Sequence, residues 1–185
     1  MSRDICIFQS FLTPAHKAQI TAAAEAAGMT PYFFTKDQFN AARDCVQHCE
    51  VLYAASPDLL RTAPATLKWY CASSAGVDAY CRDESLFANP NCLLSNSNAY
   101  GVTIAEHTIM VTLMLLRQMP AYLDAARAHR WAAPAPVRSI HGCRVTILGT
   151  GDLGGNIARR MRGMGAEKII GRSRSGKARE AGIFD

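Results

Sequence analysis

The sequence has no long hydrophobic run, and this absence argues against a membrane-spanning protein. The longest membrane-like segment, Ile109–Leu116, is far shorter than the roughly 20 apolar residues that a membrane-spanning helix needs. The start, MSRDICIFQSF, has neither the apolar stretch nor the cleavage-site pattern of a secretory signal. With 185 residues, 49% of them apolar and 19% charged, and a mean hydropathy of -0.01, the composition is typical of a globular protein with a substantial core. We expect no membrane partner.

Basic runs and paired cysteine motifs are also missing. The net charge of +5 is modest, and no Lys/Arg run is interleaved with aromatic residues, so we expect no nucleic-acid partner. The cysteines are odd in number and scattered singly: Cys6, Cys45, Cys49, Cys71, Cys81, Cys92 and Cys143. Several stand in apolar segments, where a thiol behaves as a small hydrophobe. This pattern favours a reducing compartment, and we expect a cytoplasmic protein.

One local group, Cys45-Val-Gln-His48-Cys49, suggests half of a metal site. No second pair of ligands follows it, and the same spacing fits one face of a helix. We therefore predict no metal site.

The sequence does contain a regular alternation of strand-like and helix-like segments. Five segments are predicted as strands: Asp4–Gln9, Thr30–Thr35, Val51–Ala55, Leu67–Ser73 and Cys92–Ser95. Thr13-Pro14 begins a helix that ends before Gly28. Asp37 caps a second helix, which extends through Cys49. This alternation predicts an α/β fold over residues 1–98, with a five-stranded parallel sheet and helices on both faces.

From Val102 to about Ala128 the pattern is that of one long helix. Its centre, IMVTLMLL, is apolar nearly all round, so we expect it to be buried on most sides and to connect two domains across residues 99–130. A loop rich in proline and alanine follows at Trp131–Ser139. A second strand–helix series then begins, which assigns residues 131–185 to a second domain. Its parts are a strand at Arg144–Leu148, a glycine turn, a helix to about Gly163 and a strand at Lys168–Ile170.

The glycine turn has the G-x-G-x-x-G spacing of a dinucleotide-binding site, between a strand and a helix. Gly149 allows the tight turn, Gly151 lets the backbone approach a pyrophosphate, and Gly154 permits close packing of the helix on the strand. The N–H groups around Asp152 and Leu153 direct partial positive charge at the phosphates. The alternative is a tight turn without a ligand.

The residues about twenty positions further along indicate which dinucleotide is bound. An acidic residue at this position holds the ribose hydroxyls of NAD. Here the chain reads Gly171-Arg172-Ser173-Arg174-Ser175, with no carboxylate. Arg172, Ser173 and Arg174 can bind a 2′-phosphate through charge-assisted hydrogen bonds. We therefore favour NADP as the cofactor, with NAD possible; the alternative is a solvated basic turn after an edge strand.

Three motifs in this order resemble the D-isomer-specific 2-hydroxyacid dehydrogenases. They are LKWYCASSAGVD at Leu67–Asp78, GVTIAEH at Gly101–His107, and the glycine turn. The resemblance covers essentially the whole chain but only about the first three-fifths of the family's pattern. It implies a flavodoxin-like parallel-sheet domain followed by an incomplete Rossmann-type dinucleotide-binding unit.

The resemblance also assigns site residues. It implies that the turn of Ser74, Ala75, Gly76 and Val77 presents N–H groups to a substrate carboxylate, which a glycine allows to approach closely. It places Ile104 against the nicotinamide ring. Glu106 and His107 match a motif of the family. We do not assign His107 to catalysis, because the acid–base histidine of the family lies further along the chain, and we expect His107 to pack or cap within its helix.

The chemistry that the resemblance implies is hydride transfer between the nicotinamide and C2 of a small 2-oxo or 2-hydroxy acid. The arginine that polarises the carbonyl and the histidine that moves the proton belong to a later part of the family's pattern. No catalytic residue is therefore assigned, and we expect the 185-residue chain by itself to be inactive. The resemblance also implies a homodimer through the Val102–Ala128 region. The alternative function is a non-catalytic dinucleotide-binding or dimerisation module; an FMN protein is disfavoured because no Ser/Thr-rich loop follows the first strand.

Overall fold

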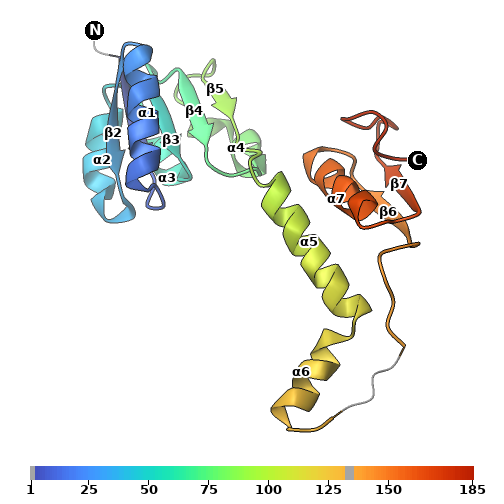
Figure 1. The fold of residues 1–185 in the computed structure, drawn as a ribbon. Helices are drawn as coiled ribbons and strands as arrows, with labels where there is room; N and C mark the ends of the chain where they lie inside the picture. Colours follow the sequence, from blue (N-terminus) through green and yellow to red (C-terminus); the bar gives the residue numbers. More distant parts are fainter. Residues whose placement is uncertain (1–2, 132–135) are drawn as a thin grey trace. The chain divides into compact units, whose positions relative to one another are not determined.

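The computed structural model describes residues 3–131 and 136–185, which divide into two compact units. The first unit is Met1–Asn98 and the second is Ala99–Asp185. Figure 1 shows strands and helices in both units, so the predicted α/β fold is confirmed. No helix in the described part of the chain is long and apolar enough to cross a membrane. The centre of the predicted loop at Trp131–Ser139, residues 132–135, lies outside the described residues.

The first unit is built on a five-stranded sheet. Its strands are β1 (Arg3–Phe8), β2 (Met29–Phe34), β3 (Cys49–Ala54), β4 (Trp69–Ala72) and β5 (Leu93–Ser95). Every pair is parallel and the order is β2-β1-β3-β4-β5, which confirms the predicted parallel sheet, with strand ends that differ from the predicted ones by at most two residues. Pro31 lies in β2, where its missing N–H is tolerated because β2 is an edge strand.

The helices of the first unit begin and end largely where their caps predict. They are α1 (Pro14–Ala26), η1 (Lys36–Gln38), α2 (Phe39–Val46), α3 (Pro57–Arg61), α4 (Asp78–Arg82) and η2 (Glu84–Leu86). Thr13 caps α1 by accepting a hydrogen bond from the His16 N–H at 3.2 Å, and Gly28 follows the helix with φ +67°. The helix predicted from Asp37 through Cys49 is shorter at both ends: Asp37 does not cap it but lies within η1, and Cys49 already belongs to β3.

The sheet of the first unit is covered on both faces. Because neighbouring strand residues point in opposite directions, Cys6 and Ile7 face opposite sides, and both are buried. Cys6 belongs to a core cluster with Val46 of α2 and Leu59 of α3, whereas α1 lies on the other face (Figure 1). Complete burial of a side chain such as Leu59 contributes about 1.5–3 kcal/mol.

In its described residues, 99–131 and 136–185, the second unit contains a two-stranded sheet and three helices. Its elements are α5 (Gly101–Leu116), α6 (Met119–Arg127), β6 (Arg144–Leu148), α7 (Asp152–Gly163) and β7 (Lys168–Arg172). β6 and β7 are parallel, and α7 connects them in the predicted strand–helix–strand order. The core consists of six buried residues, Ile140, Ile147, Ala158, Met161, Ala166 and Ile169.

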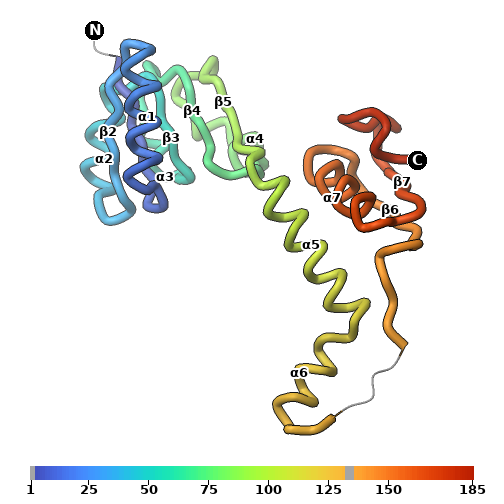
Figure 2. The backbone as a smooth tube through the Cα atoms, in the orientation of Figure 1, coloured from blue at the N-terminus to red at the C-terminus, as the bar shows by residue number. Residues whose placement is uncertain are grey.

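The prediction of one helix from Val102 to Ala128 is wrong. The chain turns between α5 and α6 (Figure 2), and Gln118 adopts a left-handed conformation with φ 53°. Pro120 explains the break, since a proline inside a helix lacks an N–H and clashes with the carbonyl four residues earlier. That carbonyl belongs to Leu116, the last residue of α5.

The expected burial of this helix on most sides is also wrong. Ile109, Leu113 and Leu116 pack against the core of the second unit. Other apolar side chains remain exposed: Val102, Ile104, Met110, Val111, Leu115, Met119 and Leu123. Within the described residues, α5 therefore has one packed face and one apolar face in contact with solvent.

Candidate nucleotide and carboxylate sites

The glycine turn between β6 and α7 is shaped by the conformation of its glycines. Gly149 follows the strand with φ +98°, a region that only glycine adopts readily. Its N–H donates to the Arg172 carbonyl at 2.8 Å, so the turn is attached to β7. Gly151 is the N-cap of α7, and its carbonyl accepts the Gly155 N–H at 2.9 Å. The first N–H groups of α7, at Asp152 and Leu153, have no partner within a helix by geometry and carry partial positive charge.

Steric contacts explain why glycine occurs at two positions of the turn, Gly154 and Gly151, and the reason differs between them. A Cβ atom on Gly154 would collide with the carbonyl oxygen of Gly149 and approach Cγ2 of Ile147 to 3.3 Å. Gly154 is therefore required for the close approach of α7 to the strand. A Cβ atom on Gly151 would meet nothing within 4 Å. The space in front of Gly151 is open to an approaching group, which fits a pyrophosphate held by a helix N-terminus.

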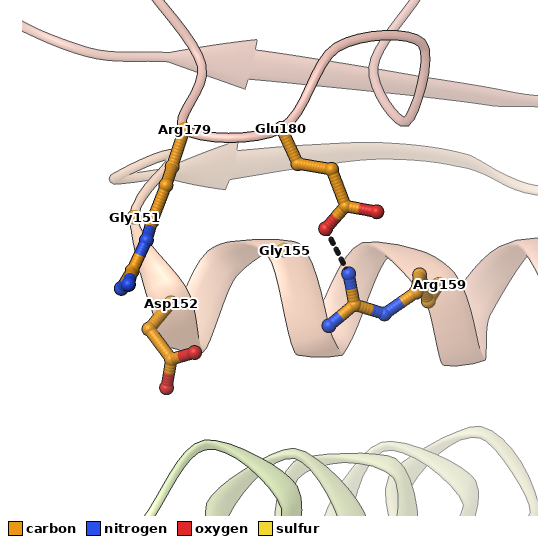
Figure 3. A pocket seen from close by; sticks show the side chains of 6 residues that line it. All are labelled: Gly151, Asp152, Gly155, Arg159, Arg179 and Glu180. Atoms are coloured by element: carbon orange, nitrogen blue, oxygen red, sulfur yellow. Dashed lines mark hydrogen bonds and ion pairs between the residues drawn. The ribbon is translucent and has the colours of Figure 1, made fainter. Parts of the chain in front are cut away.

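Two pockets adjoin this turn. One, of about 280 Å³, is lined by Gly151, Asp152, Gly155, Arg159, Arg179 and Glu180 (Figure 3). The other, of about 390 Å³, is lined by Thr150, Gly151, Ser173, Ser175, Lys177, Ala178 and Arg179. Because Gly151 and Arg179 line both, the pockets are neighbours along the same turn. An extended ligand that crosses Gly151 can fill both of them.

The charged residues that line the first pocket differ in whether another side chain is paired with them. Arg159 is paired with Glu180, as the dashed line in Figure 3 shows. The Arg179 side chain extends beside Gly151 toward the first turn of α7 (Figure 3), and no ion pair of Arg179 occurs within residues 3–131 and 136–185. The Asp152 carboxylate is directed elsewhere: it accepts from Asn156 at 3.3 Å and lies against Gly101 of α5. Arg179 is thus the cation at this pocket that is available to an anion.

The basic segment after β7 differs in detail from the prediction. Ser173 lines the larger pocket, but Arg172 and Arg174, both exposed, do not. Lys177 and Arg179 line it instead. These two residues were missed because sequence spacing locates the end of β7 but not the direction of the side chains that follow.

Backbone contacts explain why Lys177 and Arg179 reach the pocket. The chain reverses at Gly176, which has φ +67°, and the Gly176 N–H donates to the Ser173 carbonyl at 3.3 Å. The buried Thr150 then holds the returning segment: its hydroxyl donates to the Lys177 carbonyl at 3.0 Å, and its own carbonyl accepts the Arg179 N–H at 3.1 Å. A signal was present in the sequence as Ser-Gly-Lys-Ala-Arg at 175–179, a turn glycine followed by two bases.

The predicted carboxylate-binding turn lies after β4, in the first unit. Its carbonyls are occupied: Gly76 O accepts from the Ser74 hydroxyl at 2.8 Å, and Ala75 O accepts from the Asn96 amide at 2.7 Å. Ala75 and Gly76 are exposed, whereas Val77 packs against the core and is the N-cap of α4. Within the described residues, no hydrogen bond is found from the N–H of Ala75 or of Gly76. The turn therefore presents donors, not acceptors, to solvent.

The predicted residues of α5 differ in their exposure and in their partners. Ile104 is 42% exposed. Glu106 pairs with Arg160 of α7, with 3.6 Å between Oε1 and Nη2. His107 is exposed, and it neither packs nor caps within the helix as expected, because its side of α5 has no covering element in the described part of the second unit. Gly101 explains how α5 and α7 come close, since a Cβ there would clash with Asp152 and Asn156.

Residues 109–183 match the family described as "D-isomer specific 2-hydroxyacid dehydrogenase, NAD binding domain". The chain is 32% identical to a D-lactate dehydrogenase of Staphylococcus epidermidis over 108 residues, which make up 57% of this chain and 32% of that relative. The chain thus spans about a third of the length of the curated relatives that it matches.

Two crystal structures resemble the whole fold. A D-isomer specific 2-hydroxyacid dehydrogenase family protein from Aeromonas salmonicida has a TM-score of 0.78 and 27% identity, covering 100% of this chain and 57% of its own. An NADPH-dependent glyoxylate/hydroxypyruvate reductase from Sinorhizobium meliloti, in complex with NADP and sulfate, has a TM-score of 0.67 and 26% identity, covering 96% of this chain and 54% of its own.

Proposed function

We propose that this chain, which is similar to D-isomer-specific 2-hydroxyacid dehydrogenases, forms part of an NAD(P)-dependent oxidoreductase that interconverts small 2-oxo and 2-hydroxy acids. The bound nicotinamide supplies or accepts the hydride. All seven cysteines are free thiols, which supports our proposal that the reaction takes place in the cytoplasm, a reducing compartment.

The observation that carries this proposal is the pair of pockets on either side of Gly151. The open space at Gly151 and the first N–H groups of α7 fit a pyrophosphate, and Gly154 allows α7 to approach the strand closely enough to present them. The residues assigned to this task are Gly149, Gly151, Asp152, Leu153 and Gly154, of which Asp152 and Leu153 act through their backbone N–H groups.

The second pocket supports a preference for NADP. Its lining contains Lys177, Arg179 and two serines but no carboxylate, and the exposed Arg172 and Arg174 belong to the same segment. A charge-assisted hydrogen bond to a 2′-phosphate contributes about 1.5–3 kcal/mol, which corresponds to roughly tenfold or more in affinity. The reductase from Sinorhizobium meliloti, whose structure contains NADP, agrees with this preference.

Calorimetry with NADPH and NADH tests the cofactor site. We expect NADPH to bind at least about tenfold more tightly than NADH. Lys177→Ala, at a residue that lines only the larger pocket, should weaken NADPH alone, whereas Arg179→Ala, beside Gly151, should weaken both nucleotides. Arg43→Ala, an exposed arginine of α2, is the control and should change neither affinity. Equal affinities for NADPH and NADH, together with an unchanged NADPH affinity in both site variants, would contradict the proposal.

The first unit supplies the substrate carboxylate site in this proposal. The N–H groups of Ala75 and Gly76 bind the carboxylate, Ser74 fixes the turn through its hydrogen bond to Gly76 O, and Val77 anchors the turn to the core. Ile104, on α5, contacts the nicotinamide ring. Polarisation of the carbonyl and proton transfer belong to residues for which the family pattern gives no counterpart among these 185.

We therefore expect the 185-residue chain to bind nucleotide without useful turnover. General acid–base catalysis is worth about 10²–10⁴ in rate, and removal of an electrostatic contact to the carbonyl oxygen costs a similar factor. NADPH oxidation should be measured with glyoxylate, pyruvate and hydroxypyruvate on protein whose mass is verified. Turnover well above background that disappears in His107→Ala would show that the catalytic centre is misassigned.

The exposed apolar face of α5 and α6 supports a homodimer. Leu115 is 67% exposed and Met110 is 48% exposed, and such surfaces are typically covered by a partner. Sedimentation should show a dimer that Leu115→Glu converts to a monomer, while Gln19→Glu, which adds the same charge on α1, leaves it unchanged. A wild-type monomer at all concentrations would contradict the dimer.

The alternative function is a non-catalytic module. A stable dimer that binds nucleotide but shows no turnover when any continuation of the chain is included would favour this alternative.

A further inference from the structure

Three cysteine thiols meet in the core of the first unit. Cys6 of β1 and Cys49 of β3 are buried, while Cys45 of α2 is half-buried. The sulfur atoms of Cys45 and Cys49 are 3.6 Å apart. The Cys49 thiol also approaches the Cys45 carbonyl at 3.2 Å, and the Cys6 thiol approaches the Ala42 carbonyl at 3.7 Å. All three side chains thus occupy the space between α2 and the sheet.

The three thiols differ in acidity because of this arrangement. Hydrogen bonds from the Cys49 and Cys6 thiols, helped by the nearby charge of His48, lower the pKa of Cys45 to about 4. The same hydrogen bonds to Cys45, together with burial, raise the pKa of Cys6 and of Cys49. A thiolate is the nucleophilic form of cysteine. The half-buried Cys45 thiol is therefore the most acidic of the three.

We propose that Cys45 and Cys49 form an oxidation site, at which a hydroperoxide such as hydrogen peroxide converts the two thiols to an intramolecular disulfide. Cys45 is the attacking residue and Cys49 is the resolving residue. No metal is needed for this role, and no group of three or more His, Cys, Asp or Glu residues in the described chain is arranged to hold one. The proposal is independent of the nucleotide and carboxylate sites.

The chemistry proceeds in two balanced steps. The Cys45 thiolate attacks one peroxide oxygen, the O–O bond breaks, and the departing hydroxide takes a proton to become water, which leaves Cys45 as a sulfenic acid. The Cys49 sulfur then attacks the Cys45 sulfur and the S–O bond breaks. The departing hydroxide takes the Cys49 proton and becomes a second water. Two thiols have lost two electrons and two protons, and the peroxide has been reduced to two molecules of water.

The two sulfur atoms start close together. A disulfide requires sulfur atoms about 2.05 Å apart, so the pair at 3.6 Å must move closer before the bond forms. Cys45 lies in the last turn of α2 and Cys49 is the first residue of β3. The disulfide therefore joins two elements that are already adjacent, and it does not require the sheet to open.

Peptide mapping of the intact chain tests the proposal without any variant. Trypsin releases Asp44–Arg61, which contains Cys45 and Cys49 and no other cysteine, while Cys6 is on Asp4–Lys17. After treatment with hydrogen peroxide and alkylation of the remaining thiols, Asp44–Arg61 should be found unalkylated and lighter by two hydrogen atoms. Treatment with dithiothreitol before alkylation should restore two alkylated cysteines.

Variants then identify the roles of the two residues. Cys49→Ser should leave a sulfenic acid on Cys45, detected as an adduct with dimedone, and Cys45→Ser should leave Cys49 reduced. Cys81→Ser, at an exposed cysteine outside the cluster, is the control and should keep the disulfide. Asp44–Arg61 alkylated at both cysteines after the wild type has consumed peroxide would overturn the proposal. A disulfide between Asp4–Lys17 and Asp44–Arg61 would equally overturn it, because Cys6 would then be the resolving residue.

Discussion

The two units use the same strand–helix–strand architecture but differ in how completely they enclose a core. In the first unit five strands are covered on both faces, and its main core cluster contains fourteen buried residues. In the second unit two strands and α7 enclose six. Leu148 of β6 is 82% exposed and Ile170 of β7 is 40% exposed. The first unit is therefore stabilised by its own contacts, whereas the second exposes apolar side chains that further protein surface would have to bury.

The two candidate sites show a related difference. Each is a turn that follows a parallel strand and presents N–H groups, as expected at the carboxyl ends of such strands. The turn at Ser74–Val77 is followed by α4, a helix of 5 residues, whereas the glycine turn is followed by α7, a helix of 12. The first N–H groups of α7 carry partial positive charge, whereas the free donors of the other turn, at Ala75 and Gly76, precede the helix. This difference fits our proposal of a carboxylate at the first turn and a pyrophosphate at the second.

The largest effect that we expect comes from a core substitution that separates the stabilities of the two units. Leu59→Ala removes a fully buried side chain from the first core and should lower the free energy of unfolding of that unit by about 2–5 kcal/mol. Met161→Ala is the matched change in the second core. Hydrogen exchange should show faster exchange in β1 and β3 for Leu59→Ala and in α7 for Met161→Ala. Equal acceleration of both units by either variant would show that they unfold together.

A smaller effect on stability, but a decisive one on binding, is expected at Gly154. Gly154→Ala places a Cβ against the Gly149 carbonyl and should destabilise the second unit by about 1–3 kcal/mol, with loss of detectable NADPH binding. Gly163→Ala is the control, because a Cβ on this exposed residue of α7 would meet nothing within 4 Å and Gly163 lines neither pocket. Thermal unfolding and calorimetry measure both quantities. If Gly163→Ala is as damaging as Gly154→Ala, the close approach of α7 to the strand is not the cause.

These glycines illustrate what a sequence predicts well. The five strands, the cap at Thr13 and the strand–glycine–helix order follow from local preferences and periodicity, which act within a few residues. The roles of Gly149 and Gly154 follow from backbone sterics at fixed spacing. Pro120 is also a local signal, because it indicates a break in the helix. The prediction of one helix instead followed the apolar pattern of the surrounding segment.

Other features depend on contacts that spacing does not encode. Lys177 and Arg179 reach the pocket because Gly176 reverses the chain and Thr150 holds the returning backbone, and neither contact is visible in a motif. The exposure of α5 was missed for a similar reason. An apolar stretch indicates that a surface needs a cover, but it does not indicate whether that cover is part of the described chain.

The ends of α1 and α5 offer a further comparison between the units, with an effect of about 1 kcal/mol. Both helices end in a left-handed residue, which is Gly28 in the first unit and Gln118 in the second. Gly28→Ala should cost about 1 kcal/mol, because a Cβ disfavours positive φ. Gln118→Gly should stabilise by less than that, since it also removes the hydrogen bond from Gln118 to the Pro136 carbonyl. Denaturant unfolding measures both. A stabilising Gly28→Ala would contradict the left-handed geometry at that position.

The smallest effect concerns acid stability, for which one carboxylate of each unit is compared, Asp83 in the first and Asp185 in the second. Hydrogen bonds from Ser85 and then Arg61 lower the pKa of Asp83 in the first unit. The Ile169 N–H, at 2.6 Å, and then Arg162, at 2.7 Å, lower the pKa of Asp185 in the second. A lowered folded-state pKa means that the stabilisation is complete above the unfolded value of about 3.9 and is lost as the pH falls through the lower folded value.

We therefore expect Asp83→Asn and Asp185→Asn to destabilise their own units slightly at pH 7, and to differ less from the wild type at pH 3. Both carboxylates are 39% exposed, so solvent screening keeps either effect small. Hydrogen exchange of the Ile169 amide should accelerate more in Asp185→Asn than that of any amide near Asp83 does in Asp83→Asn. The reason is that Asp185 accepts a backbone N–H of a strand in the unit with the smaller core. A deficit of the same size at pH 7 and pH 3 would show that the charge of the carboxylate is not what stabilises either unit.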